Sequence, residues 1–253
     1  MVGHQVLLQL VKPSGRLWQA YTVFLKYVTE SLASSQVEGE FAGMVKLHAL
    51  APDLVPKPIA RGKLKESESA IASPEGAGGR ATTYFLITEF KNFTSSNVLP
   101  DAAKLGARLA ALHRRSALTM LGGTSTSTSG GRFGFGIQTY DGSRTQAVGW
   151  QDRWTPFFAQ LLAEAYRQDT EANGTWPELE AAYQRVQSHL IPRLIGALEA
   201  DGRSVTPVLI HGDLWDRNVG VEQNTSDPWI FDCGVYYAHH EMELGIWRAE
   251  NIG

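Results

Sequence analysis

The sequence predicts an α+β protein with two lobes, a small β-rich N-terminal lobe and a larger helical C-terminal lobe. Three observations carry this prediction: apolar and β-branched runs near the start, long segments with helical spacing in the middle, and short apolar runs between polar loops near the end. The change from strands to helices places the lobe boundary near residues 89–100. A ligand is expected in a cleft between the two lobes.

The N-terminal region is predicted to begin with a β-hairpin. Residues 6–10 and 18–28 are rich in β-branched and aromatic side chains, and the Pro-Ser-Gly sequence at 13–15 suits a turn between them. Lys26 therefore lies within a strand. Residues 35–50 carry apolar side chains at helical spacing, and the prolines that follow end the pattern. A helix is thus expected after the strand that carries the lysine.

The next part of the chain connects the two predicted lobes. Residues 66–79 are rich in Ser, Gly and Glu, which predicts a mobile loop. The apolar run at 84–90 predicts a buried strand. Residues 101–115 place leucines on one face, with an acidic residue near the start and basic residues at the end, which predicts a helix.

The second lobe is predicted to be mainly helical. Residues 122–131 are flexible by composition, and the Gly and aromatic residues at 133–142 indicate a loop. Two long helices and three short strands are then expected, at residues 154–170 and 177–200 for the helices and at 208–210, 218–221 and 229–231 for the strands.

Composition excludes several classes of protein. The chain has 253 residues, a mass of 27.8 kDa and 43% hydrophobic residues, which excludes global disorder. A net charge of only −3 argues against nucleic-acid or anionic-membrane partners. No apolar run approaches the ~18 residues of a membrane-spanning helix, and no signal peptide is evident, so a cytoplasmic protein is expected. The single cysteine, Cys233, fits a reducing compartment and is predicted to be an inert buried thiol.

The segment most informative about chemistry begins after the first of the three short strands. Asp213 follows the strand at 208–210, Asp232 follows the strand at 229–231, and Asn218 lies five residues after the first aspartate. Magnesium-assisted phosphoryl transfer requires such groups, because one aspartate can accept the proton of the substrate hydroxyl and oxygen ligands can hold the metal ions. The residues by themselves therefore indicate phosphoryl transfer.

These residues resemble a known family. His-Gly-Asp at 211–213, followed by Asn at 218 and by Ile-Phe-Asp at 230–232, is similar to the aminoglycoside-phosphotransferase-like branch of the protein-kinase superfold. The fuller string His-Gly-Asp-Leu-Trp-x-x-Asn-x-Gly at 211–220, with Val-Tyr-Tyr-x-His-x-Glu at 235–241, resembles the fructosamine kinases, or ketosamine-3-kinases, which include protein-ribulosamine 3-kinases. Recognisable pieces extend from about residue 24 to 247.

The resemblance implies both a fold and an activity. The fold would be protein-kinase-like, and the reaction would be ATP-dependent phosphorylation of ketosamines at the sugar O3, in fructosamine or ribulosamine adducts on lysines. Such a reaction repairs glycated proteins. ATP and Mg²⁺ would be the cofactors, and ketosamine-modified proteins or small ketosamines the substrates.

The resemblance also implies roles for residues of the motif. Asp213 would be the catalytic base, His211 would orient the catalytic loop, and Asn218 and Asp232 would be the magnesium ligands. Trp215, next to the base in sequence, is a candidate for stacking on a sugar face.

The nucleotide would be held by residues of the first lobe. The resemblance implies that Lys26 contacts the phosphates and that Glu40 holds Lys26 by an ion pair. Glu38 is an alternative partner, but two positions on a helix differ by about 200°, so only one of the two glutamates can face the lysine. The hinge, which includes Glu89 and Phe90, would recognise adenine through its backbone.

One question about the second lobe stays open at this point. Trp154 is a second candidate for substrate contact, although it and Trp215 can equally be core aromatics.

The domains expected are residues 1–90, which bind the nucleotide, and residues 91–253, a catalytic lobe that is incomplete at its C-terminus.

The chain also departs from the family pattern. Both ends look shortened, because the family has more chain before Lys26 and several helices after the segment that ends here at residue 253. Two alternative functions therefore stay open: a kinase of another small molecule, such as an aminoglycoside or choline, and a truncated, inactive pseudoenzyme that binds nucleotide. The oligomeric state is not predicted.

Overall fold

The structure is a computed structural model that describes residues 2–11, 17–29, 31–64, 82–95, 98–121 and 130–248. The predicted turn, the predicted mobile loop and most of the flexible tract lie outside these residues, at 13–15, 66–79 and 122–131. The chain folds as two compact units. One contains the described residues up to Arg108 together with Asp216–Asp232, and the other contains Leu109–Trp215 and the described residues from Cys233. The expected domain division at residue 90 stays a prediction.

The first unit contains a four-stranded antiparallel sheet with strand order β1-β2-β4-β3. Its strands are β1 (Val2–Val11), β2 (Leu17–Val28), β3 (Pro58–Lys63) and β4 (Tyr84–Glu89). Strands β1 and β2 form the predicted hairpin, and β4 lies between β2 and β3 with Leu86 opposite Lys26. The strands predicted at 6–10, 18–28 and 84–90 are thus confirmed.

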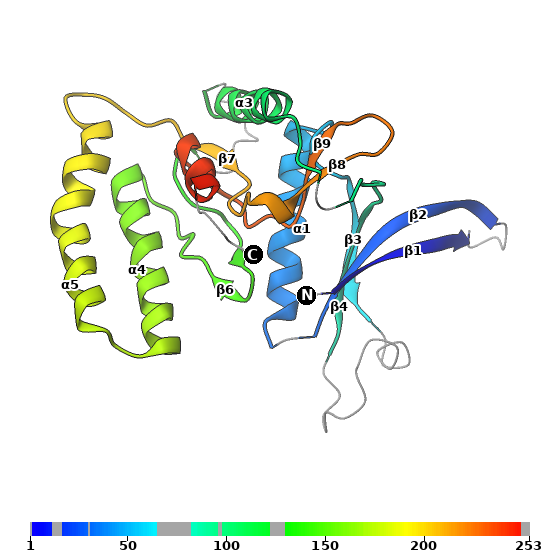
Figure 1. Ribbon diagram of the computed structural model, residues 1–253, viewed down its shortest axis with the longest axis horizontal. Coiled ribbons are helices and arrows are strands. Elements are labelled where there is room, and N and C mark those ends of the chain that lie inside the picture. Colours follow the sequence, from blue (N-terminus) through cyan, green and yellow to red (C-terminus); the bar gives the residue numbers. More distant parts are fainter. Residues whose placement is uncertain are drawn as a thin grey trace. The chain divides into compact units, whose positions relative to one another are not determined.

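Helix α1 (Ala33–Leu50) confirms the helix predicted after the lysine strand. Figure 1 shows it beside the sheet, where it packs against β3 and β4. Val37, Met44 and Leu47 are buried, as expected for an apolar face at helical spacing. This packing fixes the helix against the sheet and sets which of its glutamates faces β2.

A late segment of the chain joins this first unit. Strands β8 (Val219–Val221) and β9 (Pro228–Ile230) form a hairpin, close to the strands predicted there. The N–H of Thr94 donates to the carbonyl of Val221 at 2.8 Å, and the N–H of Ile230 donates to the carbonyl of Leu54 at 2.9 Å. These backbone bonds attach the hairpin, and the residues at both its ends, to the rest of the first unit.

The second unit holds most of the helices. Helix α3 (Ala102–Leu121) runs into it from the first unit, and Figure 1 shows α4 and α5 side by side. Its other elements are β5 (Tyr140–Asp141), β6 (Arg144–Thr145), α4 (Trp154–Asn173), α5 (Pro177–Arg185), η1 (Val186–Ile195), η2 (Gly196–Glu199), β7 (Val208–Ile210), β10 (Tyr236–Ala238) and η4 (His240–Arg248).

The predicted helix at 177–200 differs from the structure in its winding. It is α-helical only through Arg185, π-helical from Val186 to Ile195 and 3₁₀-helical after that. Pro192 lies inside the π-helical part. Proline has no N–H and its ring clashes with the carbonyl of the preceding turn, so a wider turn relieves a clash that the α-helix cannot accommodate.

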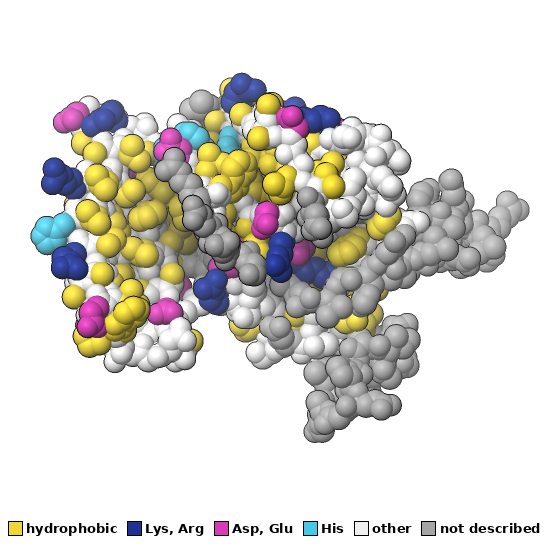
Figure 2. Space-filling model, viewed as in Figure 1, with side chains coloured by type: hydrophobic (Ala, Val, Ile, Leu, Met, Phe, Trp, Pro, Cys, Tyr) yellow, Lys and Arg dark blue, Asp and Glu magenta, His cyan; other side chains and the backbone are white. Residues whose placement is uncertain are grey.

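The core of the second unit is aromatic, and part of its surface is apolar. Phe133, Trp154 and Phe157 are buried together, with ring centroids 5.6–6.3 Å apart. Figure 2 shows hydrophobic side chains gathered over α4 and α5. Trp176 and Leu194 are among the exposed apolar residues, with 61% and 59% of their surface accessible. No helix in the described part of the chain is both long and apolar enough to cross a membrane.

Candidate active site

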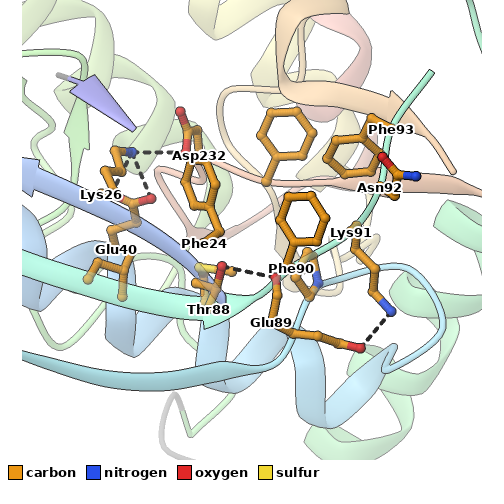
Figure 3. Close-up of a pocket in the computed structure, with 14 residues that line it drawn as sticks. Phe24, Lys26, Glu40, Thr88, Glu89, Phe90, Lys91, Asn92, Phe93 and Asp232 are labelled. Atoms are coloured by element: carbon orange, nitrogen blue, oxygen red, sulfur yellow. Dashed lines mark hydrogen bonds and ion pairs between the residues drawn. The ribbon is translucent and has the colours of Figure 1, made fainter. Parts of the chain in front are cut away.

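The first unit brings three charged side chains into contact. The Lys26 ammonium on β2 donates to both carboxylate oxygens of Glu40 on α1, at 2.8 and 2.9 Å, and to Oδ1 of Asp232 at 2.9 Å. Lys26 is 4% exposed, whereas the Asp232 side chain is 44% exposed. The three groups thus form one cluster whose aspartate reaches solvent (Figure 3).

The charges of this cluster shift its titrations. Burial disfavours the ammonium form of Lys26, but the carboxylates of Glu40 and Asp232 outweigh burial and raise the pKa of Lys26 above its usual range. Burial and the negative charge of Asp232 outweigh the attraction of Lys26 at Glu40, and raise the pKa of Glu40 to about 7. Two carboxylates therefore share one ammonium, and burial makes the Glu40 carboxylate easier to protonate than an ordinary exposed glutamate.

The helix rotation argument for Glu40 agrees with the observed pairing. Glu38 points elsewhere, and its carboxylate accepts from the Arg61 guanidinium at 2.8 Å on the exposed side of the helix. The two glutamates have different surroundings because residues two apart lie on nearly opposite faces of a helix. The nucleotide-binding roles of Lys26 and Glu40 stay predictions.

Asp232 and Asn218 lie at the two ends of the β8–β9 hairpin. The N–H of Phe231 donates to the Asn218 carbonyl at 3.1 Å, and the Asn218 carboxamide donates to the Asp232 carbonyl at 3.3 Å. Asn218 is 5% exposed. Asp232 has a φ of 58°, a left-handed conformation that aspartate tolerates better than most residues. The hairpin therefore fixes both predicted metal ligands next to each other.

The donor set suits magnesium. In the described part of the chain, no group of three or more His, Cys, Asp and Glu residues is arranged to hold a metal ion. Mg²⁺, however, is commonly bound through one or two carboxylates, with phosphate and water oxygens completing its shell. The Asp232 carboxylate and the Asn218 carboxamide are oxygen donors of the required kind, so these residues fit the ion.

A pocket of about 330 Å³ opens beside the charged cluster. Figure 3 shows Lys26, Glu40 and Asp232 at one end and the rings of Phe90 and Phe93 toward the other. The other lining residues are mainly apolar and include Phe24, Met44, Pro56, Leu86 and Phe231. An apolar slot that ends in an ammonium and a carboxylate suits a ligand with a flat ring at one end and a charged group at the other.

A glycine of the sequence motif shapes the aromatic end of this pocket. The rings of Phe93 and Phe231 are stacked with centroids 5.3 Å apart, and both line the pocket. A Cβ atom on Gly220 would lie 2.7 Å from the Phe93 ring. Glycine at position 220 thus lets Phe93 pack directly against β8, which places its ring in the pocket wall.

The predicted hinge residues border the same pocket. Glu89 and Phe90 both line it, but the Glu89 carboxylate binds the Lys91 ammonium at 2.7 Å and the Lys57 N–H at 3.3 Å. The Glu89 N–H is also used, by the Lys57 carbonyl at 2.8 Å. Beyond the end of β4, the N–H groups of Phe90 and Lys91 donate to no residue among those described. Backbone recognition would therefore fall to Phe90 and Lys91 more than to the N–H or side chain of Glu89.

The predicted catalytic loop follows β7 in the second unit. His211 is fully buried, and its carbonyl accepts the N–H of Gly234 at 3.0 Å. Gly212 has a φ of 81°, and a Cβ atom there would lie 2.2 Å from the Gly234 carbonyl oxygen. Only glycine fits this turn, which leads directly into Asp213. The role of Asp213 as a base stays a prediction.

One residue that anchors this loop was missed from the sequence. The carboxylate of Glu243 in η4 accepts the N–H of His211 at 2.6 Å and the N–H of Gly212 at 3.1 Å, and Glu243 is 2% exposed. A buried carboxylate that accepts two backbone N–H groups holds the backbone ahead of Asp213 in one conformation. Its position 30 residues after Asp213, in a segment without strong helical spacing, offered no local signal.

The two tryptophans proposed for substrate contact differ in their surroundings. Trp154 is 3% exposed and packs against Phe133, Phe157 and Phe158. This environment favours the core role that the sequence left open. Trp215 is only half-buried, so its side chain remains the better candidate for substrate contact. Its backbone N–H donates to the carbonyl of Asp213 at 3.2 Å.

Comparison with known proteins identifies related sequences. A sequence model of a family described as fructosamine kinase matches residues 16–251. The chain is 30% identical over 245 residues to a ketosamine-3-kinase of Mus musculus, covering 88% of this chain and 68% of the mouse protein. It is 28% identical over 228 residues to a chloroplastic protein-ribulosamine 3-kinase of Arabidopsis thaliana, covering 89% of this chain and 59% of the plant protein.

Two solved structures share the fold. The chain is similar to proteins named provisionally as fructosamine-3-kinases from Haemophilus somnus and Thermobifida fusca, with TM-scores of 0.59 and 0.57 and 18% identity to each. The similarity covers 89% and 90% of this chain but only 63% and 65% of theirs. This chain thus spans less than two thirds of both solved chains and of the Arabidopsis relative. The likeness confirms the predicted α+β, protein-kinase-like fold.

Proposed function

Because the chain belongs to the fructosamine kinase family, we propose that it is an ATP-dependent kinase of ketosamines, which phosphorylates the sugar O3 of fructosamine or ribulosamine adducts. Relatives of this chain are named for ketosamine and protein-ribulosamine substrates. Phosphorylated adducts on proteins would then be released, which makes the reaction a repair of glycated protein. The substrates would be glycated proteins or small ketosamines, and the site of action the cytoplasm.

One observation carries the proposal: the contact of Lys26 with Glu40 and Asp232 at the end of an apolar pocket. ATP has a flat base and a charged triphosphate, which match the two ends of this pocket. The adenine would lie among Phe24, Phe90 and neighbouring apolar side chains, with the backbone N–H groups of the hinge as donors. The phosphates would lie at Lys26.

The reaction requires a base and a metal site in addition to this pocket. Asp213 would accept the proton of the sugar hydroxyl as the bond between its oxygen and the γ-phosphorus forms and the bond to the leaving ADP oxygen breaks. Asn218 and Asp232 would hold Mg²⁺, which when bound neutralises charge on the phosphates. Lys26 would fix the nucleotide in line, and Glu40 would keep Lys26 in place.

The test is to measure MgATP affinity and ketosamine-dependent ADP release with the purified chain. We expect both, with fructosyl-lysine and ribulosyl-lysine as acceptors. Lys26→Met removes the phosphate contact and is expected to weaken MgATP binding, whereas Lys63→Met, at an exposed position of β3, leaves it unchanged. Nucleotide binding without ADP release would support the pseudoenzyme, and release only with an aminoglycoside or choline would support the other kinase.

A separate variant tests the assignment of the base. Asp213→Asn keeps the size of the side chain but removes the proton acceptor, so turnover is expected to be lost while MgATP binding is retained. Asp216→Asn, at an exposed position three residues later, is the matched control and is expected to keep activity. Full activity of Asp213→Asn contradicts the assignment.

A further inference from the structure

The short segment that follows β4 is fixed at both of its ends within the first unit. At its start, the N–H of Glu89 donates to the carbonyl of Lys57 at 2.8 Å, and the Glu89 carboxylate accepts the N–H of Lys57 at 3.3 Å. At its far end, the N–H of Gln223 donates to the carbonyl of Asn92 at 2.8 Å. Residues 90 and 91 therefore lie between two anchored positions.

The side chain of Lys91 adds a third anchor to this segment. Its ammonium donates to the Glu89 carboxylate at 2.7 Å and lies over the ring of Trp229, 3.7 Å from the ring centroid. The Lys91 side chain is 12% exposed, and Trp229 is 7% exposed. A cation held over an indole face away from water is attracted to the ring more strongly than an exposed cation. The ammonium thus binds both a carboxylate and an aromatic face.

Trp229 connects this anchor to the proposed metal site. It lies on β9, three residues before Asp232, in the β8–β9 hairpin whose ends carry Asn218 and Asp232. Lys91 lines the nucleotide pocket, whereas Trp229 is not among the residues that line it. The Lys91 ammonium therefore joins the backbone at one end of the pocket to the hairpin that carries the proposed magnesium ligands.

The backbone N–H groups next to this anchor are available to a ligand. Those of Phe90 and Lys91 donate to no residue in the described part of the chain, and both residues line the pocket. A donor that is held in place before the ligand arrives binds it more tightly, because less conformational freedom is lost on binding. The pairing with Glu89 also offsets the Lys91 charge, so this end of the pocket suits an uncharged ring.

We propose that Lys91 is a positioning residue, whose ammonium holds the segment after β4 so that the N–H groups of Phe90 and Lys91 meet the base of the nucleotide. This inference rests on the proposed function and adds to it a side chain that sets the affinity for the base without contact to the phosphates. The sequence motif around Asp213 gives this lysine no role.

The test measures the binding of adenosine and of MgATP to the whole chain by calorimetry. Lys91→Met keeps the apolar stem of the side chain but removes the ammonium. It is expected to raise the dissociation constants of both ligands by the same factor, about tenfold, because both ligands use the same base site. Lys91→Arg keeps a cation that stacks on the indole and binds the carboxylate, so it is expected to bind both ligands as the wild type does. Lys63→Met, at an exposed position of β3, is the matched control and is expected to have no effect.

Kinetics separate a positioning role from a general loss of structure. With fructosyl-lysine as the acceptor, Lys91→Met is expected to raise the KM for ATP about tenfold and to leave kcat unchanged, because only nucleotide binding is affected. Lys91→Gln is a second uncharged variant and is expected to give the same split between KM and kcat. Thermal unfolding checks that each variant is folded.

Two results overturn the inference and leave the proposed function standing. One is adenosine and MgATP binding as in the wild type by both Lys91→Met and Lys91→Gln. The other is weaker MgATP binding with adenosine binding unchanged, because Lys91 would then act as a charge that attracts the phosphates. A wild-type chain that binds both ligands but releases no ADP with any acceptor overturns the proposed function alone. A wild-type chain that binds neither ligand overturns both.

Discussion

Glu40→Gln tests whether two carboxylates share the Lys26 ammonium. The substitution keeps the shape of the side chain and one acceptor for Lys26, but it removes the buried carboxylate. In the folded protein, burial and the charge of Asp232 raise the pKa of Glu40 from 4.5 to about 7. The folded state therefore binds more protons than the unfolded state between these two values, so Glu40 lowers the free energy of unfolding as pH rises through this window.

The size of the effect follows from the two pKa values. The shift from 4.5 to about 7 corresponds to a loss of about 2–3 kcal/mol between pH 5 and pH 8. Glu40→Gln abolishes this component. Relative to the wild type, the variant is thus expected to gain stability over that pH range by the same amount, measured by urea denaturation at pH 5 and pH 8.

Glu38→Gln is the matched control for this experiment. It lies on the same helix, but its carboxylate is exposed and pairs with Arg61 at the surface. An exposed ion pair contributes roughly 0–1 kcal/mol, so the control is expected to follow the pH profile of the wild type. A Glu40→Gln profile parallel to that of the wild type would refute the reasoning, because Glu40 would then carry no raised pKa.

Two further variants test the loop anchor and the aromatic wall. Glu243→Gln weakens the carboxylate anchor of the loop after β7, so kcat is expected to fall about 10- to 100-fold with the KM for ATP unchanged. The matched control Glu241→Gln changes an exposed side chain and is expected to have no effect on kcat. Equal kcat values for Glu243→Gln and the wild type in steady-state assays would contradict the anchoring role. Gly220→Ala forces the Phe93 ring to move, so we expect the free energy of unfolding to fall by about 1–3 kcal/mol and MgATP binding to weaken. Gly245→Ala has open space around the added methyl group and is expected to leave both quantities unchanged. Thermal unfolding measures the stability, and calorimetry measures the MgATP affinity.

The sequence by itself determined most of the elements. Hydrophobic spacing placed α1, α4 and the strands of the first sheet within a few residues, because these patterns act over short distances and do not depend on the rest of the fold. Helix rotation alone also showed that only one of Glu38 and Glu40 could face Lys26, and the family resemblance implied that it would be Glu40. The sequence pattern could not show the change to π-helical winding around Pro192, because that change depends on how the neighbouring turns relieve the clash of the proline ring with the backbone.

Only the tertiary structure decided which distant residues meet. Lys26 and Asp232 are 206 residues apart in sequence, and no local pattern specifies their 2.9 Å contact. The packing of the β8–β9 hairpin on the first unit produces it. The same holds for the contacts of Glu243 with the loop after β7 and for the buried position of Trp154. Burial and hydrogen bonding across a fold depend on which surfaces come together, and that information lies in no short stretch of the chain.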